Sequence, residues 1–495
     1  MDLYKENQED FNQLSNEKQN IQDDRYIFDP SIRILPEKTT EEKLNVDLIT
    51  LFTNLNESLS LNLFEKAQIE LIEIVNNLVS FQPDEKTFDF IINSNLHLQI
   101  LSILQAPPTY EIYHYSIYLI SSLFAISWKY EKIEIFNKFN SIENFNLLDF
   151  FIQKFNPNYK AEPTRQIDLL KFDFDMLPSY LQILSFYCIF LDKPICDMIT
   201  QTVIIPNLPI FFNAFEDTEL TSAASFLVSS STKYPLIIEN NEYVSWIITF
   251  TIQNVTMMDL NSQYYFFKSI NNLTQNEKMI SYLFNLNFET FLENYLKTNI
   301  SSFTNNLLDE ILTLQLKLLL ADPNKVILDY SKLIDISFRF KNLRNIAFQL
   351  FGNGMKLREK DCPLDDDNFF ASFMNLYSDA AFDMKSEIVK ILEVWMMKSS
   401  HQLVSKRALL LMNEISQFME QVSINDSLFL VVLHEIIILL DIESKSSLDE
   451  FQKSKNILES NDCVSYLTEL QNDEEADENT CKMAQEILKY FRSTE

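Results

Sequence analysis

The sequence predicts an all-α protein built from helical units that stack side by side. Three observations support this class: apolar residues recur at helical spacing, no segment alternates apolar and polar residues over more than a few positions, and only 2 of the 495 residues are glycine. Hairpin-rich sheets and phosphate-binding loops need glycine for positive φ or close backbone approach, so its scarcity argues against both. The chain is also too long for one compact core, whereas a stacked array can extend to this length.

The clearest unit lies at residues 88–124, where apolar residues form three helical blocks. The first block ends in the polar corner at residues 93–95, and the second stops at Pro107-Pro108, which no helix interior tolerates. The third, residues 111–124, is apolar on most sides, which predicts a helix buried on most sides. Short helix, corner, medium helix, proline break and long helix form the layout of an armadillo repeat of roughly 40–47 residues.

The remaining chain is interpreted as further copies of this unit. Residues 1–45 are polar and rich in acidic residues and amides, which predicts a flexible N-terminal arm, and residues 46–495 form the repeat array. We expect an armadillo/HEAT-type, right-handed superhelical solenoid of about ten repeats with a long concave groove. Helices are expected at residues 46–55, 63–81, 141–155, 169–191 (with Pro178 starting or kinking the helix), 243–254, 261–275, 278–296, 305–322, 325–340, 342–354, 368–380, 384–400, 404–420, 427–442, 464–471 and 480–491. Around Pro206 and Pro209 we expect a corner before the next helix.

The charge balance narrows the class of partner. Lysine and arginine number 40 against 71 aspartate and glutamate, for a net charge of −31. So acidic a surface repels nucleic acid and anionic membranes and attracts basic proteins or basic peptide segments. The alternative is that the charge serves solubility alone.

The cysteines and the apolar runs predict a cytoplasmic or nuclear location. Five cysteines occur without a CxxC pair, which indicates neither a disulfide framework nor a zinc ribbon. The N-terminus has no signal-peptide core. The longest apolar run, residues 428–440, is interrupted by His434 and Glu435 and is too short to span a bilayer.

No motif predicts catalysis, a cofactor or a metal, so we expect a protein that is not an enzyme. The four histidines lack ligand spacing, and Asp365-Asp366-Asp367 lacks the spacing and glycine of a calcium loop. The run Gly352-Asn353-Gly354 is too short for a phosphate loop and is predicted to form the turn at a helix C-terminus.

Two regions resemble importin-alpha, the nuclear-import adaptor. Residues 63–81, 88–105 and 110–124 are similar to that family's first repeat and the start of its second, and residues 464–491 are similar to its last repeat. The resemblance implies an armadillo fold in which the third helix of each repeat faces the groove with a Trp and, four residues on, an Asn. Residues i and i+4 share one helical face, where an amide can hold a peptide backbone and aromatic rings can attract Lys and Arg.

Carried onto this chain, these groove pairs fall on Tyr118 with Ser122, Phe226 with Ser230, Lys268 with Asn272, and Gln349 with Asn353. No Trp stands at a groove position, and Trp128, Trp246 and Trp395 are expected in the core. The apolar members, such as Tyr118 and Phe226, could equally fill space between stacked helices.

The resemblance also implies carriers of the importin-beta class as partners. That family binds its carrier through a basic N-terminal cluster, and residues 1–45 contain none. The first functional hypothesis is a non-enzymatic, importin-alpha-like adaptor that holds basic, nuclear-localisation-type peptide segments in an acidic groove. The alternative is an armadillo-type scaffold for folded protein partners with no role in nuclear import.

Overall fold

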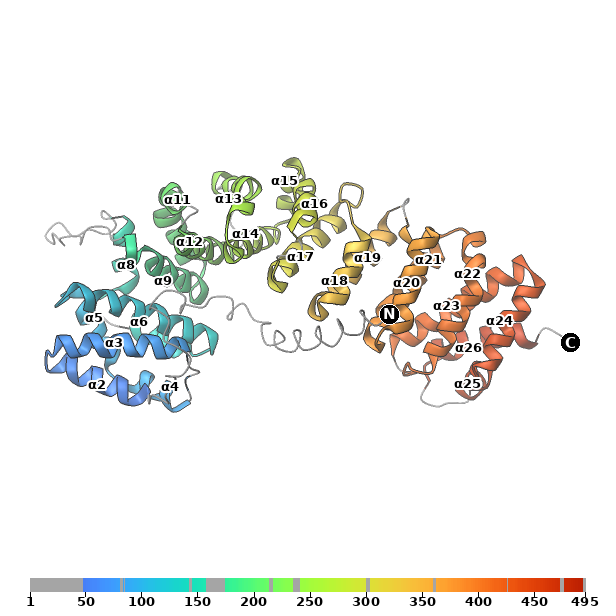
Figure 1. Cartoon of the computed structure of the whole chain (residues 1–495), viewed down its shortest axis with the longest axis horizontal. Helices are drawn as coiled ribbons and strands as arrows, with labels where there is room; N and C mark the ends of the chain where they lie inside the picture. Colours follow the sequence, from blue (N-terminus) through green and yellow to red (C-terminus); the bar gives the residue numbers. More distant parts are fainter. Residues whose placement is uncertain are drawn as a thin grey trace, which may run out of the picture. The chain divides into compact units, whose positions relative to one another are not determined.

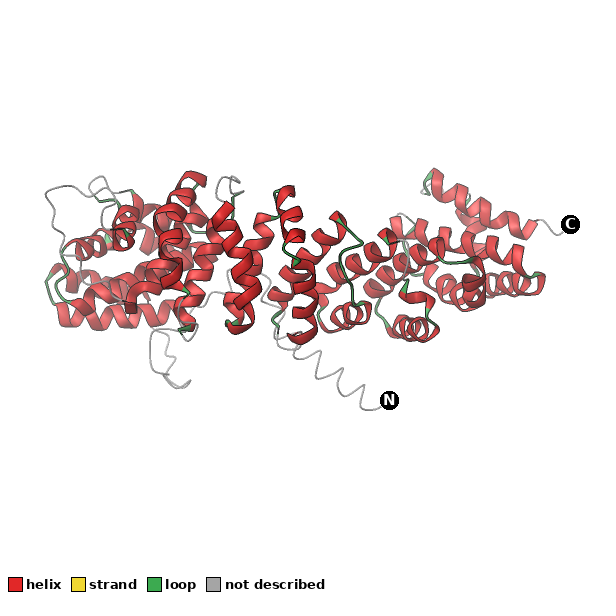
Figure 2. Ribbon diagram, turned by 90° about the horizontal axis from the view of Figure 1, so that it is seen from above, coloured by secondary structure: helices red, strands yellow, loops and turns green. Residues whose placement is uncertain are grey.

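The computed structural model describes residues 48–80, 83, 85–141, 145–156, 174–212, 217–234, 241–299, 303–358, 362–424, 426–471 and 476–492. Within these ranges the chain is helical and contains no strand, which confirms the all-α prediction (Figure 2). The predicted arm at residues 1–45 lies outside the described residues. The chain divides into two compact units, one of residues 1–286 and 301–310 and the other of residues 287–300 and 311–495.

The helices of the first unit follow one another along the chain (Figure 1). They are α2 (Leu48–Ser60), α3 (Phe64–Ser80), α4 (Glu85–Asn93), α5 (Leu96–Gln105), α6 (Tyr110–Lys129), α7 (Ile133–Asn140), α8 (Leu147–Phe155), α9 (Leu177–Phe190), α10 (Lys193–Ile199), α11 (Ile205–Phe211), α12 (Thr218–Ser231), α13 (Asn241–Asn254), α14 (Leu260–Leu273) and α15 (Glu277–Asn285). The second unit begins with α16 (Phe288–Asn299), and α17 (Asn305–Ala321) contributes residues to both units. The second unit continues with α18 (Tyr330–Arg339), α19 (Arg344–Leu357), α20 (Asp367–Asp379), α21 (Phe382–Lys398), α22 (His401–Met419), α23 (Ser427–Ser446), α24 (Leu448–Ser460), α25 (Cys463–Leu470) and α26 (Glu478–Arg492).

Long helices pack in succession within each unit. In the first unit α3 packs on α6, α6 on α9, α9 on α12, and α12 on α14. In the second, α19 packs on α21, α21 on α23, and α23 on α26 (Figure 1). In each unit the long helices therefore form a row, and the hydrophobic core lies between neighbouring helices of that row.

The three-helix layout at residues 88–124 is confirmed as α4, α5 and α6. Pro107-Pro108 separates α5 from α6, and the next residue, Thr109, caps α6 by accepting a hydrogen bond from the backbone N–H of Ile112 at 3.2 Å. The buried residues of α6 lie on most of its circumference, as its apolar composition predicts. Phe124, fully buried, lies 4.9 Å from the ring of Phe136 and 6.4 Å from that of Phe186, so aromatic rings fill the space between α6, α7 and α9.

Asparagine and aspartate occupy most of the helix corners that have a positive φ, a backbone conformation that glycine usually adopts. Positive φ angles occur at Asn62, Glu131, Asn287 and Asp462, and at neither glycine. Asn287, with φ of 53°, separates α15 from α16, which the apolar pattern had merged into one helix at residues 278–296. Asn and Asp tolerate the left-handed region better than other side chains, which explains three of these four corners.

The predicted corner at Pro206 and Pro209 is wrong, because both prolines lie inside the short helix α11. A π-helical turn at Thr200–Ile204 joins α10 to α11. A proline inside a helix cannot donate a backbone hydrogen bond and its ring displaces the carbonyl four residues earlier. The wider π turn accommodates that displacement just before Pro206.

The predicted helix C-terminal turn at Gly352-Asn353-Gly354 is also wrong, because all three residues lie inside α19. Gly354 is required by close packing: a Cβ there would overlap Leu328 and lie 2.8 Å from the Tyr330 hydroxyl. At Gly352 a Cβ would meet only Ile391 at 3.9 Å, an ordinary contact.

We expect opposite stability changes from alanine at these two glycines. Gly354→Ala lowers the free energy of unfolding by about 1–3 kcal/mol because Leu328 and Tyr330 must move. Gly352→Ala, the matched control on the same helix, raises it by up to about 1 kcal/mol because alanine favours a helix interior. Urea unfolding of the two variants measures both, and equal effects would contradict the close packing assigned to Gly354.

Candidate functional site

Three of the predicted groove residues are buried between helices. Phe226 is 3% exposed and its ring lies 5.8 Å from Trp128, 5.7 Å from Phe186 and 5.0 Å from Tyr265. The Ser230 hydroxyl donates to the Phe226 carbonyl at 2.8 Å, and Ser122 is buried in α6. The Phe226 ring packs against neighbouring helices, as the packing alternative describes.

Lys268 and Asn272 lie one helical turn apart on α14 and are half-buried. The Lys268 ammonium donates to the Tyr264 hydroxyl at 3.0 Å and lies 5.3 Å from the centre of that ring. The Asn272 amide donates to the Ser229 carbonyl at 3.4 Å and to the Thr232 hydroxyl at 3.3 Å. The Asn272 amide therefore pairs acceptors at the C-terminal end of α12, and its contact with a peptide stays a prediction.

Gln349 and Asn353 lie along one face of α19. The Asn353 amide donates to the Gln349 carbonyl at 2.8 Å, and the Gln349 amide donates to the side-chain oxygen of Asn345 at 3.1 Å. Both bonds stay within the helix, so these amides form a short polar ladder at i, i+4 and i+8. Whether this ladder contacts a peptide stays a prediction.

Tyr118 belongs to a row of aromatic rings along α6 that the sequence analysis named only in part. Tyr110, His114 and Tyr118 follow at four-residue spacing, with ring centres 5.8 Å and 4.6 Å apart. Tyr115 flanks the row at 5.6 Å from His114. Tyr110 is 48% exposed and the other three rings are half-buried, so the row reaches the surface of the first unit.

Carboxylates lie beside this aromatic row. Burial lowers the pKa of His114 below its ordinary 6.5, while the charges of Asp175 and Glu111 act in the opposite direction. His114 is therefore a neutral ring at pH 7, and Asp175 and Glu111 are both exposed. Neutral ring faces next to carboxylates attract an ammonium or guanidinium group by cation–π and Coulomb forces.

Only one of the three tryptophans is fully buried, although all three were expected in the core. Trp395 is fully buried and its indole N–H donates to a carboxylate oxygen of Asp365 at 2.9 Å. Trp128 and Trp246 are half-buried, and Trp246 stacks on Phe250 at 4.6 Å. The core prediction is confirmed for Trp395 and holds in part for the other two.

Sequence reasoning missed a buried cluster around Arg407 in the second unit. The Arg407 guanidinium, 6% exposed, donates to the carbonyls of Leu364 and Asp365 and to the Asp367 carboxylate at 2.8 Å. It also lies 4.0 Å from the centre of the Phe370 ring. The signal was an arginine on the apolar face of the helix at residues 404–420, where a cation needs buried acceptors.

A second missed feature is the buried carboxyl of Glu435 on α23. It is fully buried and neither oxygen has a hydrogen-bond partner within the described part of the chain. Burial, and then the charge of Glu393, hold its pKa well above the ordinary 4.5. Glu393 itself lies 2.7 Å from Nδ1 of His434, so α21 and α23 share a small titrating cluster.

We expect Glu435→Leu to stabilise the second unit, by about 1–4 kcal/mol at neutral pH. The folded-state pKa of Glu435 is raised, so the wild-type protein loses stability as pH rises above about 4.5, where the carboxyl ionises in the unfolded chain. The gain should therefore grow from pH 4.5 towards neutrality. Thermal unfolding across this range measures it, and Glu435→Gln is the control that removes the charge but keeps the shape. A gain independent of pH would contradict the assignment.

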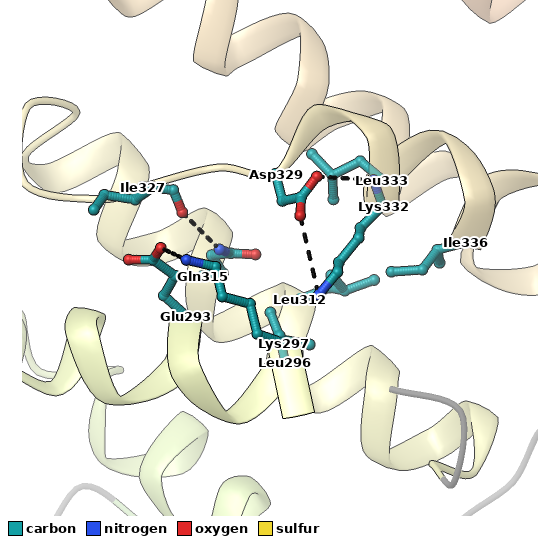
Figure 3. Close-up of a pocket in the computed structure, with 10 residues that line it drawn as sticks. All are labelled: Glu293, Leu296, Lys297, Leu312, Gln315, Ile327, Asp329, Lys332, Leu333 and Ile336. Atoms are coloured by element: carbon teal, nitrogen blue, oxygen red, sulfur yellow. Dashed lines mark hydrogen bonds and ion pairs between the residues drawn. The ribbon is translucent and has the colours of Figure 1, made fainter. Parts of the chain in front are cut away.

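A small pocket lies in the second unit between α16, α17 and α18 (Figure 3). Leu296, Leu312, Leu333 and Ile336 form its apolar lining, and the ion pairs Glu293–Lys297 and Asp329–Lys332 stand beside it (Figure 3). Its volume of about 20 Å³ holds roughly one water molecule. In this conformation the pocket is too small for an organic ligand.

The described residues hold no group of three or more histidines, cysteines or carboxylates that could bind a metal ion. Over the same residues, no helix combines the length and apolar character that a membrane span needs.

Comparison with known proteins gives a likeness in fold only. No protein-family profile matches the chain, and no curated protein matches it in sequence. Among solved structures, the chain is similar to the crystal structure of an engineered protein from the Northeast Structural Genomics Consortium, with a TM-score of 0.56 and 10% identity. The match covers 90% of this chain and 99% of the engineered protein.

Proposed function

We propose that the chain is a non-enzymatic adaptor that binds basic peptide segments. In this proposal its helices form an armadillo-type, right-handed array of about ten repeats, similar to importin-alpha, and the successive packing of long helices supports it. The same proposal includes a role in nuclear import, carriers of the importin-beta class as further partners, and a location in the cytoplasm or nucleus. The net charge of −31 favours basic protein segments over nucleic acid as partners.

The aromatic row on α6 carries the proposal. Tyr110, His114 and Tyr118 follow one another along the helix with ring centres 5.8 and 4.6 Å apart, and the charges of Asp175 and Glu111 raise the pKa of His114 against the larger effect of burial. An extended basic peptide has side chains about 7 Å apart on one face. Both ring spacings, 5.8 and 4.6 Å, are shorter than this, so we expect the row to hold one cationic side chain of the peptide.

Peptide binding as a function of salt tests the function. We expect a fluorescent Lys/Arg-rich peptide to bind the purified protein at low ionic strength, with an affinity that falls as salt is added. The control is a peptide of the same length with glutamine at every basic position. Absence of binding at low salt would overturn the proposal, because long-range attraction is strongest there.

A scaffold for folded proteins is the second candidate, and one surface favours it. On α23 the half-buried residues at successive turns are mostly apolar: Leu430, Val431, Ile437 and Ile438. On α21, which packs beside α23, Met397 is 66% exposed. Apolar side chains at such positions suit a folded partner better than a basic peptide. Binding that survives high salt and is lost in Met397→Asp would favour this candidate.

A further inference from the structure

Two of the five cysteines lie against each other in the first unit. Cys188 is near the end of α9 and Cys196 is in α10, and the Sγ of Cys196 donates to the Cys188 carbonyl at 3.3 Å. Cys196 follows Cys188 by eight residues, so this contact brings the end of α9 and the first turns of α10 together. Both side chains are buried, so they share one apolar corner between packed helices.

A lysine completes this corner. The Lys233 ammonium donates to the Ile189 carbonyl at 2.7 Å, which holds it at the end of α9 beside both thiols. The Tyr234 hydroxyl donates to the Leu191 carbonyl at 2.9 Å, at the same C-terminal end of α9. A fixed positive charge favours a thiolate over a thiol.

The two thiols differ from each other and from the rest in acidity. The neighbouring Cys188 thiol, and then the charge of Lys233, lower the pKa of Cys196, whereas the Cys196 thiol and burial raise the pKa of Cys188. Burial raises the pKa of Cys362 to about 11 and that of Cys463 to about 12. Cys196 is therefore the thiol in this set that ionises most readily.

The helix that carries Cys196 is irregular. α10 has only seven residues and continues into the π-helical turn at Thr200–Ile204. Pro206 and Pro209 follow, and each lacks the backbone N–H of a regular helix. Short, irregular segments open more often than long helices, which gives small molecules access to a buried thiol.

We propose that Cys188 and Cys196 form a redox modification site that closes to a reversible intramolecular disulfide. The oxidant is a low-molecular-weight disulfide of the glutathione type. The Cys196 thiolate attacks one sulfur of the oxidant and expels one thiolate, which leaves a mixed disulfide on Cys196. Cys188 then loses its proton to solvent, attacks the Cys196 sulfur and expels the second thiolate. Two protein thiols are oxidised to one disulfide and one oxidant disulfide is reduced to two thiols.

The bond would join the end of α9 to α10, next to the π-helical turn. The disulfide restricts local opening of the segment that carries Cys196. The oxidised protein should therefore be more stable than the reduced protein. We expect its melting temperature to rise by a few degrees, on the order of 5 °C.

The test is incubation of the full chain with oxidised glutathione, followed by alkylation, proteolysis and mass spectrometry of the peptides. We expect a Cys188–Cys196 cross-linked peptide, three alkylated cysteines, and reversal by dithiothreitol. The partly exposed Cys362 and Cys481 are internal controls for reagent access. A chain in which Cys362 or Cys481 becomes glutathionylated while Cys188 and Cys196 both remain free would overturn the proposal.

The variant Cys188→Ala separates the two chemical steps. Without the second thiol, the reaction should stop at a mixed disulfide on Cys196, visible as a glutathione adduct on that peptide. Its melting curve, measured beside that of the wild type, shows that the variant is folded. No adduct on Cys196 in the folded variant would contradict its role as the attacking thiol.

Discussion

Arg407→Met is expected to lower the free energy of unfolding of the second unit by about 2–4 kcal/mol. The substitution leaves the carbonyls of Leu364 and Asp365 without their donor and removes the cation from the face of Phe370. The buried Leu364 carbonyl left unpaired costs about 1–3 kcal/mol, the carbonyl of the exposed residue Asp365 costs less because water can reach it, and methionine keeps much of the apolar contact. Chemical denaturation followed by circular dichroism measures the change.

Lys406 is the matched control, because it is the neighbouring residue and binds the same carboxylate. Its ammonium lies 2.7 Å from Asp367 but is 61% exposed, and Asp367 is 62% exposed. Lys406→Met should change the free energy of unfolding by no more than about 0.5 kcal/mol. Equal costs at the two positions would show that the charge of Asp367, and not the backbone carbonyls, explains the stability.

The pH dependence of the Arg407 variant follows from Asp367. Hydrogen bonds from Lys406, and then from Arg407, hold the pKa of Asp367 below the ordinary 3.8. This contribution is present above pH 3.8 and disappears as pH falls through the lower folded-state value. The part of the Arg407→Met effect due to Asp367 should therefore vanish in acid, while the part due to the backbone carbonyls persists.

Phe226→Ala is expected to cost about 3–5 kcal/mol of stability in the first unit. Its ring lies between those of Trp128, Phe186 and Tyr265, at centre distances from 5.0 to 5.8 Å, so truncation leaves a cavity shared by three helices. Thermal unfolding measures the loss. The matched control is Phe382→Ala, because the Phe382 side chain is 45% exposed and its removal should cost much less.

This prediction also separates packing from peptide contact. If Phe226 fills space, a variant that remains folded at low temperature should bind a basic peptide as well as the wild type does. A folded Phe226→Ala protein with unchanged stability and weaker peptide binding would instead support a role of Phe226 in contacting the peptide.

The sequence predicted the helical elements well wherever a local signal marks their ends. Pro107-Pro108 and the capping Thr109 mark the start of α6, and Pro178 lies in the first turn of α9 as expected. The errors fall where a distant contact decides. Gly354 lies inside α19 with Leu328 and Tyr330 packed closely against it, and nothing within α19 itself indicates those neighbours.

The candidate site shows the same limit. Four-residue spacing paired Tyr118 with Ser122, whose side chain is buried in α6, because spacing alone cannot tell which face meets another helix. In α12 the face with Phe226 and Ser230 is the packed one, because α9 and α14 flank that helix on two sides. The partners of Asn272 lie about 40 residues earlier in the chain, so its role in holding α12 depends on the tertiary fold.

The most direct measurement of the central claim is the affinity of one Lys/Arg-rich peptide for the wild type, Tyr118→Ala and Met257→Ala at low salt. Met257 is a control with an exposed apolar side chain in the same unit. If the aromatic row on α6 holds cationic side chains, Tyr118→Ala weakens binding by about 3- to 30-fold while Met257→Ala leaves it unchanged. Equal affinities for all three proteins, with melting curves showing each to be folded, would contradict the claim.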